Sequence, residues 1–438
     1  MRILLAFLGA ALALAALPAA AQTLPAYNID RNSITVSGVS SGGYMAVQMH
    51  VAHSSRFAGV GVVAGGPYYC AEDTLALALT RCLRPAAADQ PDPARLAFLT
   101  QLFATQGHID PVDGLATDPV WIFSSPDDTV VSQPVSDRLL DYYLAFVDPL
   151  RVAYVNNVRG EHSMPTTDFG FPCFYKGASA NPGDHFINDC DYDAAGAMLT
   201  HLLRRVRRLD TVATGNVIAF DQSAFLAQPT AHGMSATGYA YVPDVCASGA
   251  RCKLHVAFHG CLQGASRIGE TFVRNAGYNR WADANRIVVL YPQATASLQQ
   301  GNGNGCWDWW GYDDAHYMWR EGRQVAAVMR MVDRIAGGTT AEAPPPAPSG
   351  LQARVALDGT LSLRWNRVDD PRVDGYTVFS AQAAAGPFVQ VGADMVTAPE
   401  LSLADPAGAA RYYTVVSVTR SGLESVSAPA VVVALPGP

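Results

Sequence analysis

The chain has 438 residues, of which 49% are hydrophobic, and it carries a formal net charge of −8. This length is sufficient for two or three domains, one of them with a large core. Nucleic-acid binding and anionic-membrane binding both call for clustered positive charge, so the composition argues against both.

Residues 1–21 are predicted to be a secretory signal peptide. Arg2 supplies the positive start, an apolar run extends from Ile3 to Leu17, and three alanines precede Gln22. The run is too short for a comfortable membrane span, so a retained anchor is the less favoured interpretation. We expect the mature protein to be secreted to the extracellular space, with the periplasm as the alternative. Once the signal is removed, we expect it to be free of the membrane.

Eight cysteines in an exported chain indicate disulfides. They are Cys70, Cys82, Cys173, Cys190, Cys246, Cys252, Cys261 and Cys306. Pairing neighbours along the chain gives four bridges and is the simplest proposal, although eight cysteines allow about a hundred complete pairings. A zinc site is the competing interpretation, but no CxxC or HExxH spacing supports it, and we expect neither a metal nor an organic cofactor.

Residues 22–338 are predicted to form an α/β domain, because short β-rich runs alternate with amphipathic stretches, a pattern that favours a mostly parallel sheet. The predicted strands are Ile34–Val39, Gly59–Val63, Val120–Phe123, Val152–Val155, Val217–Phe220, Tyr239–Val242, Leu254–Phe258 and Ile287–Tyr291. Helical periodicity predicts a helix over His316–Ile335, which two glycines then end.

Residues 339–350 are rich in Ala and Pro, a composition typical of a semi-rigid linker. Residues 351–438 show short alternating strands separated by turn residues, which favours a small β-sandwich. This segment resembles a fibronectin type III module in the positions of Trp365, Tyr376 and the Tyr412–Tyr413 pair. Because the linker separates it from the α/β region, we expect it to fold separately, with few contacts to that region.

The sequence Gly38-Val39-Ser40-Ser41-Gly42 has the GxSxG pattern of a nucleophile elbow. It lies between a predicted strand and a helical stretch from Tyr44 to His53, which is the context that an elbow requires. The N-terminus of the helix would favour negative charge that develops at the serine. A flexible glycine-rich loop is the alternative. Ser40 is therefore the predicted nucleophile.

A serine nucleophile needs a base, and the base needs an orienting carboxylate. Asp127 and Asp128 follow the strand Val120–Phe123, and either one fits the acid, with a turn aspartate as the alternative. His162 follows the next predicted strand. Because α/β-hydrolases place the serine, the acid and the histidine in this chain order, His162 is the predicted base.

The oxyanion hole requires two backbone N–H groups, and the residue after the nucleophile, Ser41, supplies one. The second normally comes from a His-Gly loop earlier in the chain. Too few residues of the mature chain precede the Ser40 strand for such a loop, and His259-Gly260-Cys261 follows the strand Leu254–Phe258 far downstream instead. The order predicts a circularly permuted α/β-hydrolase in which Cys261 is the second donor. A strand-end turn that holds a disulfide cysteine is a compatible alternative.

Residues 303–312 contain three tryptophans and a tyrosine among glycines, which indicates an apolar binding surface, with ordinary aromatic core as the alternative. If Cys306 pairs with Cys261, Trp307 lies beside the oxyanion hole. The residues predicted to contact substrate are Trp307, Tyr44 and His259.

Four of these segments occur in one order over residues 25–338, and together they resemble the extracellular poly(3-hydroxybutyrate) depolymerases of the permuted type. The segments are Gly38–Met49, Phe123–Val131, Gly160–Pro165 and His259–Cys261. In that family a Ser-Gly-x-x-Asp-Thr-Val-Val segment carries the acid, which assigns this role to Asp128 and places Ser125 where the family has Gly. The predicted triad is then Ser40, Asp128 and His162.

The resemblance implies a secreted serine esterase that hydrolyses poly(3-hydroxybutyrate), related short-chain polyhydroxyalkanoates or their oligomers through an acyl-enzyme. We expect a monomer that acts on a hydrophobic polyester or oligoester. The family often adds a polymer-binding domain after its type III module, and this chain ends before one, which weakens the expectation of granule binding. One alternative is a feruloyl or acetyl-xylan esterase. A second is a non-catalytic surface-binding protein, against which the intact predicted triad argues.

Overall fold

The computed structural model describes residues 22–177, 183–203, 206, 213–337, 344–356, 358–384, 388–391, 395–403, 411–419 and 424–433. The predicted signal peptide, residues 1–21, and the first part of the predicted linker lie outside the described residues. Within these ranges, none of the helices combines the length and the apolar character needed to cross a membrane.

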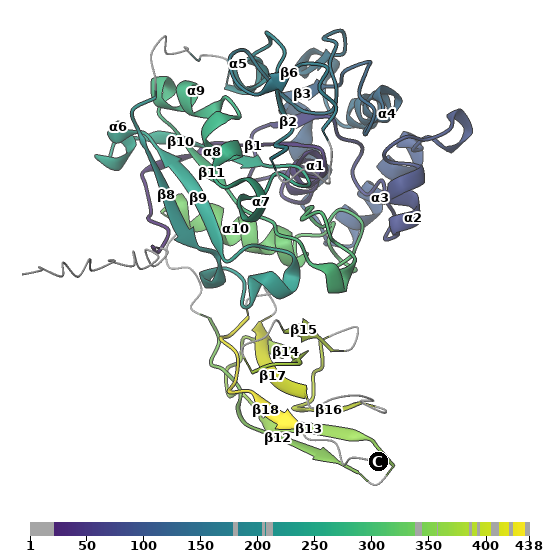
Figure 1. Cartoon of the computed structure of the whole chain (residues 1–438), viewed down its shortest axis with the longest axis vertical. Helices are drawn as coiled ribbons and strands as arrows, with labels where there is room; N and C mark the ends of the chain where they lie inside the picture. The colour runs from purple at the N-terminus through teal and green to yellow at the C-terminus, as the bar shows by residue number, and fades with distance from the viewer. Residues whose placement is uncertain are drawn as a thin grey trace, which may run out of the picture.

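An eight-stranded sheet forms the centre of the larger part of the chain, in the order β4-β3-β2-β1-β10-β11-β9-β8 (Figure 1). Its strands are parallel from β4 through β11 in this order. β9 pairs antiparallel with β11, and β8 pairs antiparallel with β9. The strands are β1 (Ile29–Val39), β2 (Val60–Val63), β3 (Val120–Phe123), β4 (Val152–Val155), β8 (Asn216–Asp221), β9 (Thr237–Val242), β10 (Cys252–Phe258) and β11 (Ile287–Tyr291). The mostly parallel sheet predicted from the sequence is therefore confirmed.

The helices and a small second sheet complete this part of the chain. The helices are α1 (Ser41–Ala52), α2 (Leu75–Thr80), α3 (Pro93–Thr105), α4 (Gln133–Leu144), α5 (Ala194–Leu203), α6 (Asp244–Ala247), α7 (Ala265–Ile268), α8 (Thr271–Asn275), α9 (Tyr278–Asn285) and α10 (Arg323–Ile335). The small sheet pairs β5 (Met164–Thr166), β7 (Ile187–Asp189) and β6 (Phe171–Pro172).

Side chains on the two faces of the central sheet belong to separate hydrophobic clusters. On β3, Ile122 packs with the cluster that contains α1 and α10, whereas Trp121 and Phe123 pack with the cluster that contains α5 and α9. This alternation follows from the two-residue period of a strand. Because helices cover both faces, the architecture has three layers, and every residue of α1 is buried between the sheet and its neighbours.

Two predicted boundaries differ most from the structure. The helix predicted over His316–Ile335 begins only at Arg323, because Gly322 has the non-helical angles φ −50° and ψ 128° and caps it. A Cβ at Gly322 would also lie 2.7 Å from the Tyr317 carbonyl oxygen, so only glycine fits where the preceding turn meets the helix. The first strand begins at Ile29, five residues before the predicted start, and its pairing with β10 is irregular up to Ile34.

The C-terminal part consists of two antiparallel sheets, in the orders β12-β13-β16 and β15-β14-β17-β18. The strands are β12 (Ser349–Val355), β13 (Leu361–Asn366), β14 (Val373–Ala381), β15 (Val389–Gln390), β16 (Glu400–Leu403), β17 (Arg411–Thr419) and β18 (Val431–Val433). Trp365 and Tyr376 meet edge to face in the cluster that both sheets share. The β-rich segment is as predicted, although β12 begins inside the predicted linker; the fibronectin type III assignment stays a prediction.

The C-terminal sheets pack against the α/β region, where few contacts were expected. Phe379 and Val416 are fully buried in a cluster with Ala231 of the α/β region. Arg323 at the start of α10 donates to the Gln390 side chain at 3.0 Å. The apolar contact explains the difference from the prediction, because linker composition carries no information about the surfaces that the linker brings together.

Candidate active site

Ser40 forms the turn between β1 and α1 by itself. Its backbone has φ 57° and ψ −123°, a conformation that costs a non-glycine residue on the order of 1–3 kcal/mol. The turn is tight on both sides: a Cβ on Gly38 would lie 2.0 Å from the Gly42 oxygen, and a Cβ on Gly42 would lie 2.4 Å from the His259 oxygen. This is the strand–turn–helix geometry of a nucleophile elbow, and only glycine fits beside the serine.

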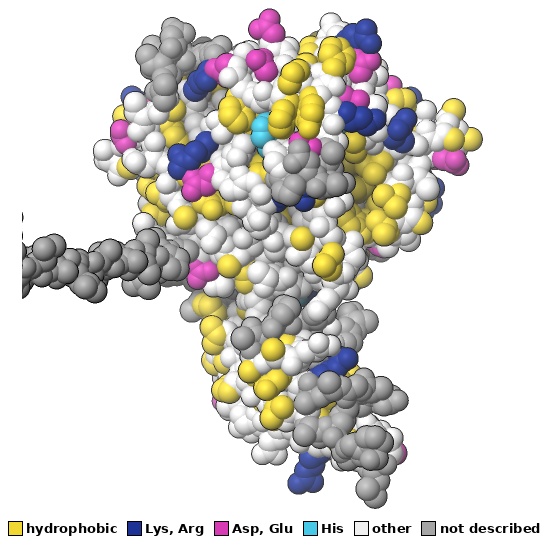
Figure 2. All heavy atoms as spheres, in the orientation of Figure 1, with side chains coloured by type: hydrophobic (Ala, Val, Ile, Leu, Met, Phe, Trp, Pro, Cys, Tyr) yellow, Lys and Arg dark blue, Asp and Glu magenta, His cyan; other side chains and the backbone are white. Residues whose placement is uncertain are grey.

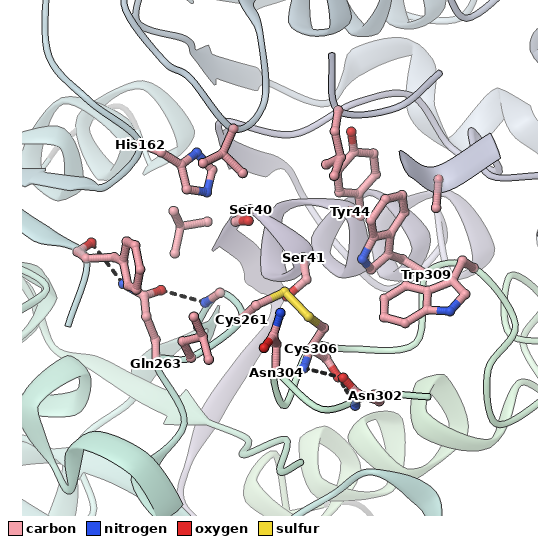
Figure 3. Close-up of a pocket in the computed structure, with 18 of the residues that line it drawn as sticks. Ser40, Ser41, Tyr44, His162, Cys261, Gln263, Asn302, Asn304, Cys306 and Trp309 are labelled. Atoms are coloured by element: carbon pink, nitrogen blue, oxygen red, sulfur yellow. Dashed lines mark hydrogen bonds between the residues drawn. A yellow bond between two sulfur atoms is a disulfide. The ribbon is translucent and has the colours of Figure 1, made fainter. Parts of the chain in front are cut away.

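His162 lies in the loop after β4, and its Nδ1 is 2.8 Å from Oδ2 of Asp128. The other carboxylate oxygen of Asp128 accepts the N–H groups of Val130 and Val131, both at 2.8 Å. An acceptor at Nδ1 places the ring proton on that nitrogen and leaves Nε2 unprotonated in the neutral ring. His162 and Ser40 face the same cavity (Figure 3).

Two side chains that the sequence reasoning did not assign hold the aspartate loop against the histidine loop. Ser125 donates its hydroxyl to the Gly160 carbonyl at 2.6 Å and accepts the Gly160 N–H at 2.9 Å. One carboxylate oxygen of Glu161 accepts the Thr129 hydroxyl at 2.8 Å. The one available signal was Ser125 itself, which stands where the family pattern has Gly.

Cys261, whose backbone N–H is the second predicted donor, lies across the cavity from His162 in the loop after β10 (Figure 3). In the described part of the chain this N–H has no hydrogen-bond acceptor, and the Ser41 N–H, at the first position of α1, has none within the helix. Gly260 explains the proximity of the two loops, because a Cβ there would lie 3.1 Å from the Ser40 Cβ. The structure therefore brings both predicted oxyanion donors to Ser40.

These groups line a cavity of about 390 Å³. Its wall is mainly apolar, and three exposed aliphatic side chains form part of its rim: Leu75, Leu79 and Val130. Leu75 and Leu79 come from α2, and Figure 2 shows further hydrophobic side chains gathered over α2 and α3. The site can therefore receive an apolar ligand that extends from the surface to Ser40.

The three predicted substrate contacts occupy different places. Tyr44 lines the cavity and stacks on Trp309 with ring centroids 4.1 Å apart. Trp307 and His259 are fully buried and do not line the cavity, which differs from the expectation. The Trp307 indole N–H donates to the His259 carbonyl at 2.9 Å, so both lie behind the wall and support it. Trp309 and Trp310 are the tryptophans that face the cavity.

The cysteines form four disulfides between neighbours in the chain, as predicted. The pairs are Cys70–Cys82, Cys173–Cys190, Cys246–Cys252 and Cys261–Cys306. Three of them support the cavity: the first closes the segment that carries α2, the second packs against Gly160, and the last joins the oxyanion loop to the tryptophan-rich loop. Among the described residues, no cluster of His, Cys, Asp or Glu has the arrangement of a metal site.

Two curated proteins are similar to this chain over most of its length. A poly(3-hydroxybutyrate) depolymerase of Delftia acidovorans is 46% identical over 372 residues, which cover 82% of this chain and 72% of the relative. A polyhydroxybutyrate depolymerase of Talaromyces funiculosus is 38% identical over 338 residues, which cover 74% of this chain and 96% of the relative. No protein-family model matches the chain.

Solved structures give the same result. The crystal structure of the PHB depolymerase from Penicillium funiculosum superposes with a TM-score of 0.64 at 35% identity, over 73% of this chain and all of that one. A PHB depolymerase complexed with an R3HB trimer gives the same values. The fold and these relatives define the class of the protein as a carboxylic ester hydrolase. More narrowly, the chain belongs to the poly(3-hydroxybutyrate) depolymerase family.

Proposed function

We propose that this protein is a secreted esterase that hydrolyses poly(3-hydroxybutyrate) or its oligomers, with Ser40 as the nucleophile. The observation that carries the proposal is the convergence of an elbow serine, a histidine with a buried carboxylate partner and the N–H groups of Ser41 and Cys261 on one apolar cavity. A neutral, water-insoluble polyester suits this cavity better than a charged substrate would. The R3HB trimer bound by a structural relative supports the same substrate class.

In the proposed mechanism, His162 Nε2 accepts the hydroxyl proton of Ser40 while the serine oxygen attacks the ester carbonyl. Asp128 holds the ring in the tautomer that the attack requires and stabilises the imidazolium that forms. The Ser41 and Cys261 N–H groups bind the tetrahedral oxyanion, and each such donor contributes roughly 3–4 kcal/mol in comparable sites. His162 then protonates the leaving alcohol, and water attacks the acyl-enzyme by the reverse path.

The strand order supports a circularly permuted α/β-hydrolase. The elbow follows β1 and the His-Gly loop follows β10, yet these strands are hydrogen-bonded neighbours in the sheet. The two loops therefore meet at the carboxyl ends of neighbouring parallel strands, as the nucleophile and oxyanion loops of an α/β-hydrolase do. Only their order along the chain is reversed.

Secretion is supported by the four disulfides, because such bonds persist in oxidising compartments, and by the apolar N-terminal run of residues 1–21.

The test is product analysis on poly(3-hydroxybutyrate) film with the wild type and the Ser40→Ala variant. We expect the wild type to release 3-hydroxybutyrate or short oligomers and the variant to release none while its circular dichroism spectrum is unchanged. Feruloyl and acetyl esters are assayed in parallel. Faster turnover of either of those esters than of 3-hydroxybutyrate oligomers would contradict the proposed substrate.

A further inference from the structure

The two peptide groups that flank Gly260 are each held by a buried side chain. His259 is fully buried, and its Nε2 accepts the Ala294 N–H at 3.0 Å. The proton of the neutral ring is therefore on Nδ1, which donates to the Gly260 carbonyl at 2.7 Å. Because burial lowers the pKa of His259 to about 4, the ring stays neutral above that pH.

The direction of the Cys261 N–H follows from this contact. In a trans peptide the carbonyl and the N–H point in opposite directions. Since His259 holds the Gly260 carbonyl on the buried side, the Cys261 N–H points away from His259, toward the cavity that Ser40 lines.

Gln263 holds the same loop from the other side. Its side-chain oxygen accepts the Gly260 N–H at 2.6 Å. Its amide nitrogen donates to the carbonyls of His185 and Phe186, both at 2.9 Å. The side chain is nearly fully buried, so all its hydrogen-bonding groups are used within the protein. Figure 3 shows the Gln263 side chain at the left of the view, below His162.

The Phe186 carbonyl also accepts the N–H of Met164, two residues after His162, at 2.9 Å. Gln263 and Met164 therefore share one acceptor. A short path of hydrogen bonds runs from the histidine loop through Phe186 and Gln263 to the His259–Gly260 peptide, which directly precedes the peptide that carries the Cys261 N–H. The two halves of the site, which lie about a hundred residues apart in the chain, are therefore linked at the cavity through one glutamine side chain.

We propose that Gln263 is a positioning residue for the oxyanion hole, which sets the Cys261 N–H relative to Ser40 and the His162 loop. The proposal rests on the proposed function of this site. Gln263 touches neither the reacting atoms nor the oxyanion; it acts through the Gly260 N–H. Removing it takes the partner from this N–H and from the His185 carbonyl, while the Phe186 carbonyl keeps the Met164 N–H. The loop then relaxes, and the Cys261 donor moves away from the developing charge. Such a displacement affects the tetrahedral state more than the bound ester.

The experiment compares Gln263→Ala with Gln222→Ala on a short p-nitrophenyl ester. Gln222 is a matched control because it is also fully buried and makes the same kinds of bonds, accepting one backbone N–H from Gln293 and donating to the Ser235 and Gln293 carbonyls. For Gln263→Ala we expect kcat to fall about 10- to 100-fold while KM changes less than threefold. An alkylboronic acid, which forms a tetrahedral adduct with a serine, should lose affinity by a similar factor.

Gln222→Ala should lower the thermal midpoint to a similar extent, with its kcat and boronate affinity within threefold of the wild type. If Gln263→Ala does not fold, Gln263→Met keeps the side-chain volume without the hydrogen bonds and takes its place. A Gln263 variant with wild-type kcat and boronate affinity, or one that changes only KM, overturns the proposal.

Ser40→Ala is measured in parallel. Retained activity in this variant would overturn the proposed function. An inactive Ser40→Ala beside a fully active Gln263 variant would overturn only the role of Gln263.

Discussion

Asp127 and Asp128 are adjacent in the chain, and their carboxylates have different partners. Asp128 is buried and contacts Nδ1 of His162, whereas Asp127 makes two hydrogen bonds of 2.7 Å with the exposed guanidinium of Arg159. The hydrogen bonds from Arg159 lower the pKa of Asp127. The two positions that the loop pattern alone could not separate are thus separated by their partners.

We therefore expect Asp128→Asn to lower kcat on a short soluble ester by about 10⁴-fold, because an amide at this position favours the wrong tautomer of His162. Asp127→Asn is the matched control and should remain within threefold of the wild type, since an exposed ion pair contributes little. Steady-state kinetics at one pH measures both variants. A greater loss in Asp127→Asn than in Asp128→Asn would contradict the assignment of the acid.

Ser125→Ala tests the junction between the aspartate and histidine loops. The change removes the hydroxyl that donates to the Gly160 carbonyl and leaves buried polar groups without a partner, which costs about 1–3 kcal/mol of the free energy of unfolding. We expect a lower thermal midpoint and a several-fold lower kcat, because the distance between Asp128 and His162 is no longer fixed. Calorimetry and ester kinetics measure these effects. Ser132→Ala is the comparison, since the Ser132 hydroxyl donates to the Leu83 carbonyl and not to the histidine loop; an equal loss of kcat there would argue against a special role for Ser125.

The sequence predicted the central sheet and the approximate place of each proposed catalytic group, because both depend on local patterns. β3, β4 and β11 have the predicted bounds, since each is a short apolar run with turn residues beside it. Ser40 was found from glycines whose backbone contacts exclude any larger residue. The disulfides follow the simplest pairing along the chain.

The sequence did not predict features that depend on tertiary contacts. Gln263 and Ser125 act through backbone groups of distant segments, and no local pattern reports such partners. Trp307 was expected at the cavity because aromatic residues among glycines are typical of binding surfaces, but its neighbour Trp309 faces the cavity instead. Which member of an aromatic tract is buried depends on the path of the loop, and the composition of the tract does not encode it.

The buried ring of His255 predicts a dependence of stability on pH. Its nitrogens contact the hydroxyls of Thr35 and Ser37 at 2.8 and 2.7 Å, and burial lowers its pKa to about 3. An unfolded histidine titrates near about 6.5, so below this pH the unfolded chain binds a proton that the folded protein excludes. The free energy of unfolding should therefore fall as the pH decreases from about 6.5 toward 3, by up to about 1.4 kcal/mol per pH unit from this residue.

Urea unfolding at several pH values between 7 and 5 measures this slope, and His255→Gln isolates the contribution of one group. The variant should be less stable at pH 7 but should lose stability more slowly as the pH falls. His53 and His259, whose pKa values burial also lowers to about 4, contribute slopes of the same sign in both proteins. Parallel slopes for the wild type and the variant would show that His255 does not take part.

Leu79 tests whether the apolar rim of the cavity contributes to contact with polymer. Its side chain is 54% exposed, lines the cavity and comes from α2. We expect Leu79→Ser to reduce release of products from polymer film several-fold, because apolar area is lost from the contact, while kcat/KM on a short soluble ester stays within twofold. Leu150→Ser is the control, since Leu150 is 90% exposed and lies outside the cavity wall. Equal losses on film in both variants would contradict a specific role for the rim.

The contact between the α/β region and the C-terminal sheets predicts that deletion of residues 344–438 destabilises the enzyme without removing its activity. No described residue of these sheets lines the cavity, so kcat/KM on a soluble ester should remain within threefold of the wild type at 25 °C. The deletion exposes Ala231 and His232, both of which Phe379 now covers. We therefore expect the thermal midpoint of the α/β region to fall by several degrees in calorimetry.

Phe379→Ala distinguishes this contact from a general effect of the missing sheets. Phe379 packs with Ala231 and Val416, outside the cluster that holds the two C-terminal sheets together, so the variant should keep these sheets folded. Losing the buried ring should cost about 3 kcal/mol of unfolding free energy, which corresponds to several degrees in a domain of this size. Val432→Ala is the control, because Val432 is 54% exposed on β18 and should leave the midpoint unchanged. If the midpoint of the α/β region is the same in the wild type, the deletion and Phe379→Ala, the contact contributes no stability and the sheets are an independent unit, as the linker composition alone predicts.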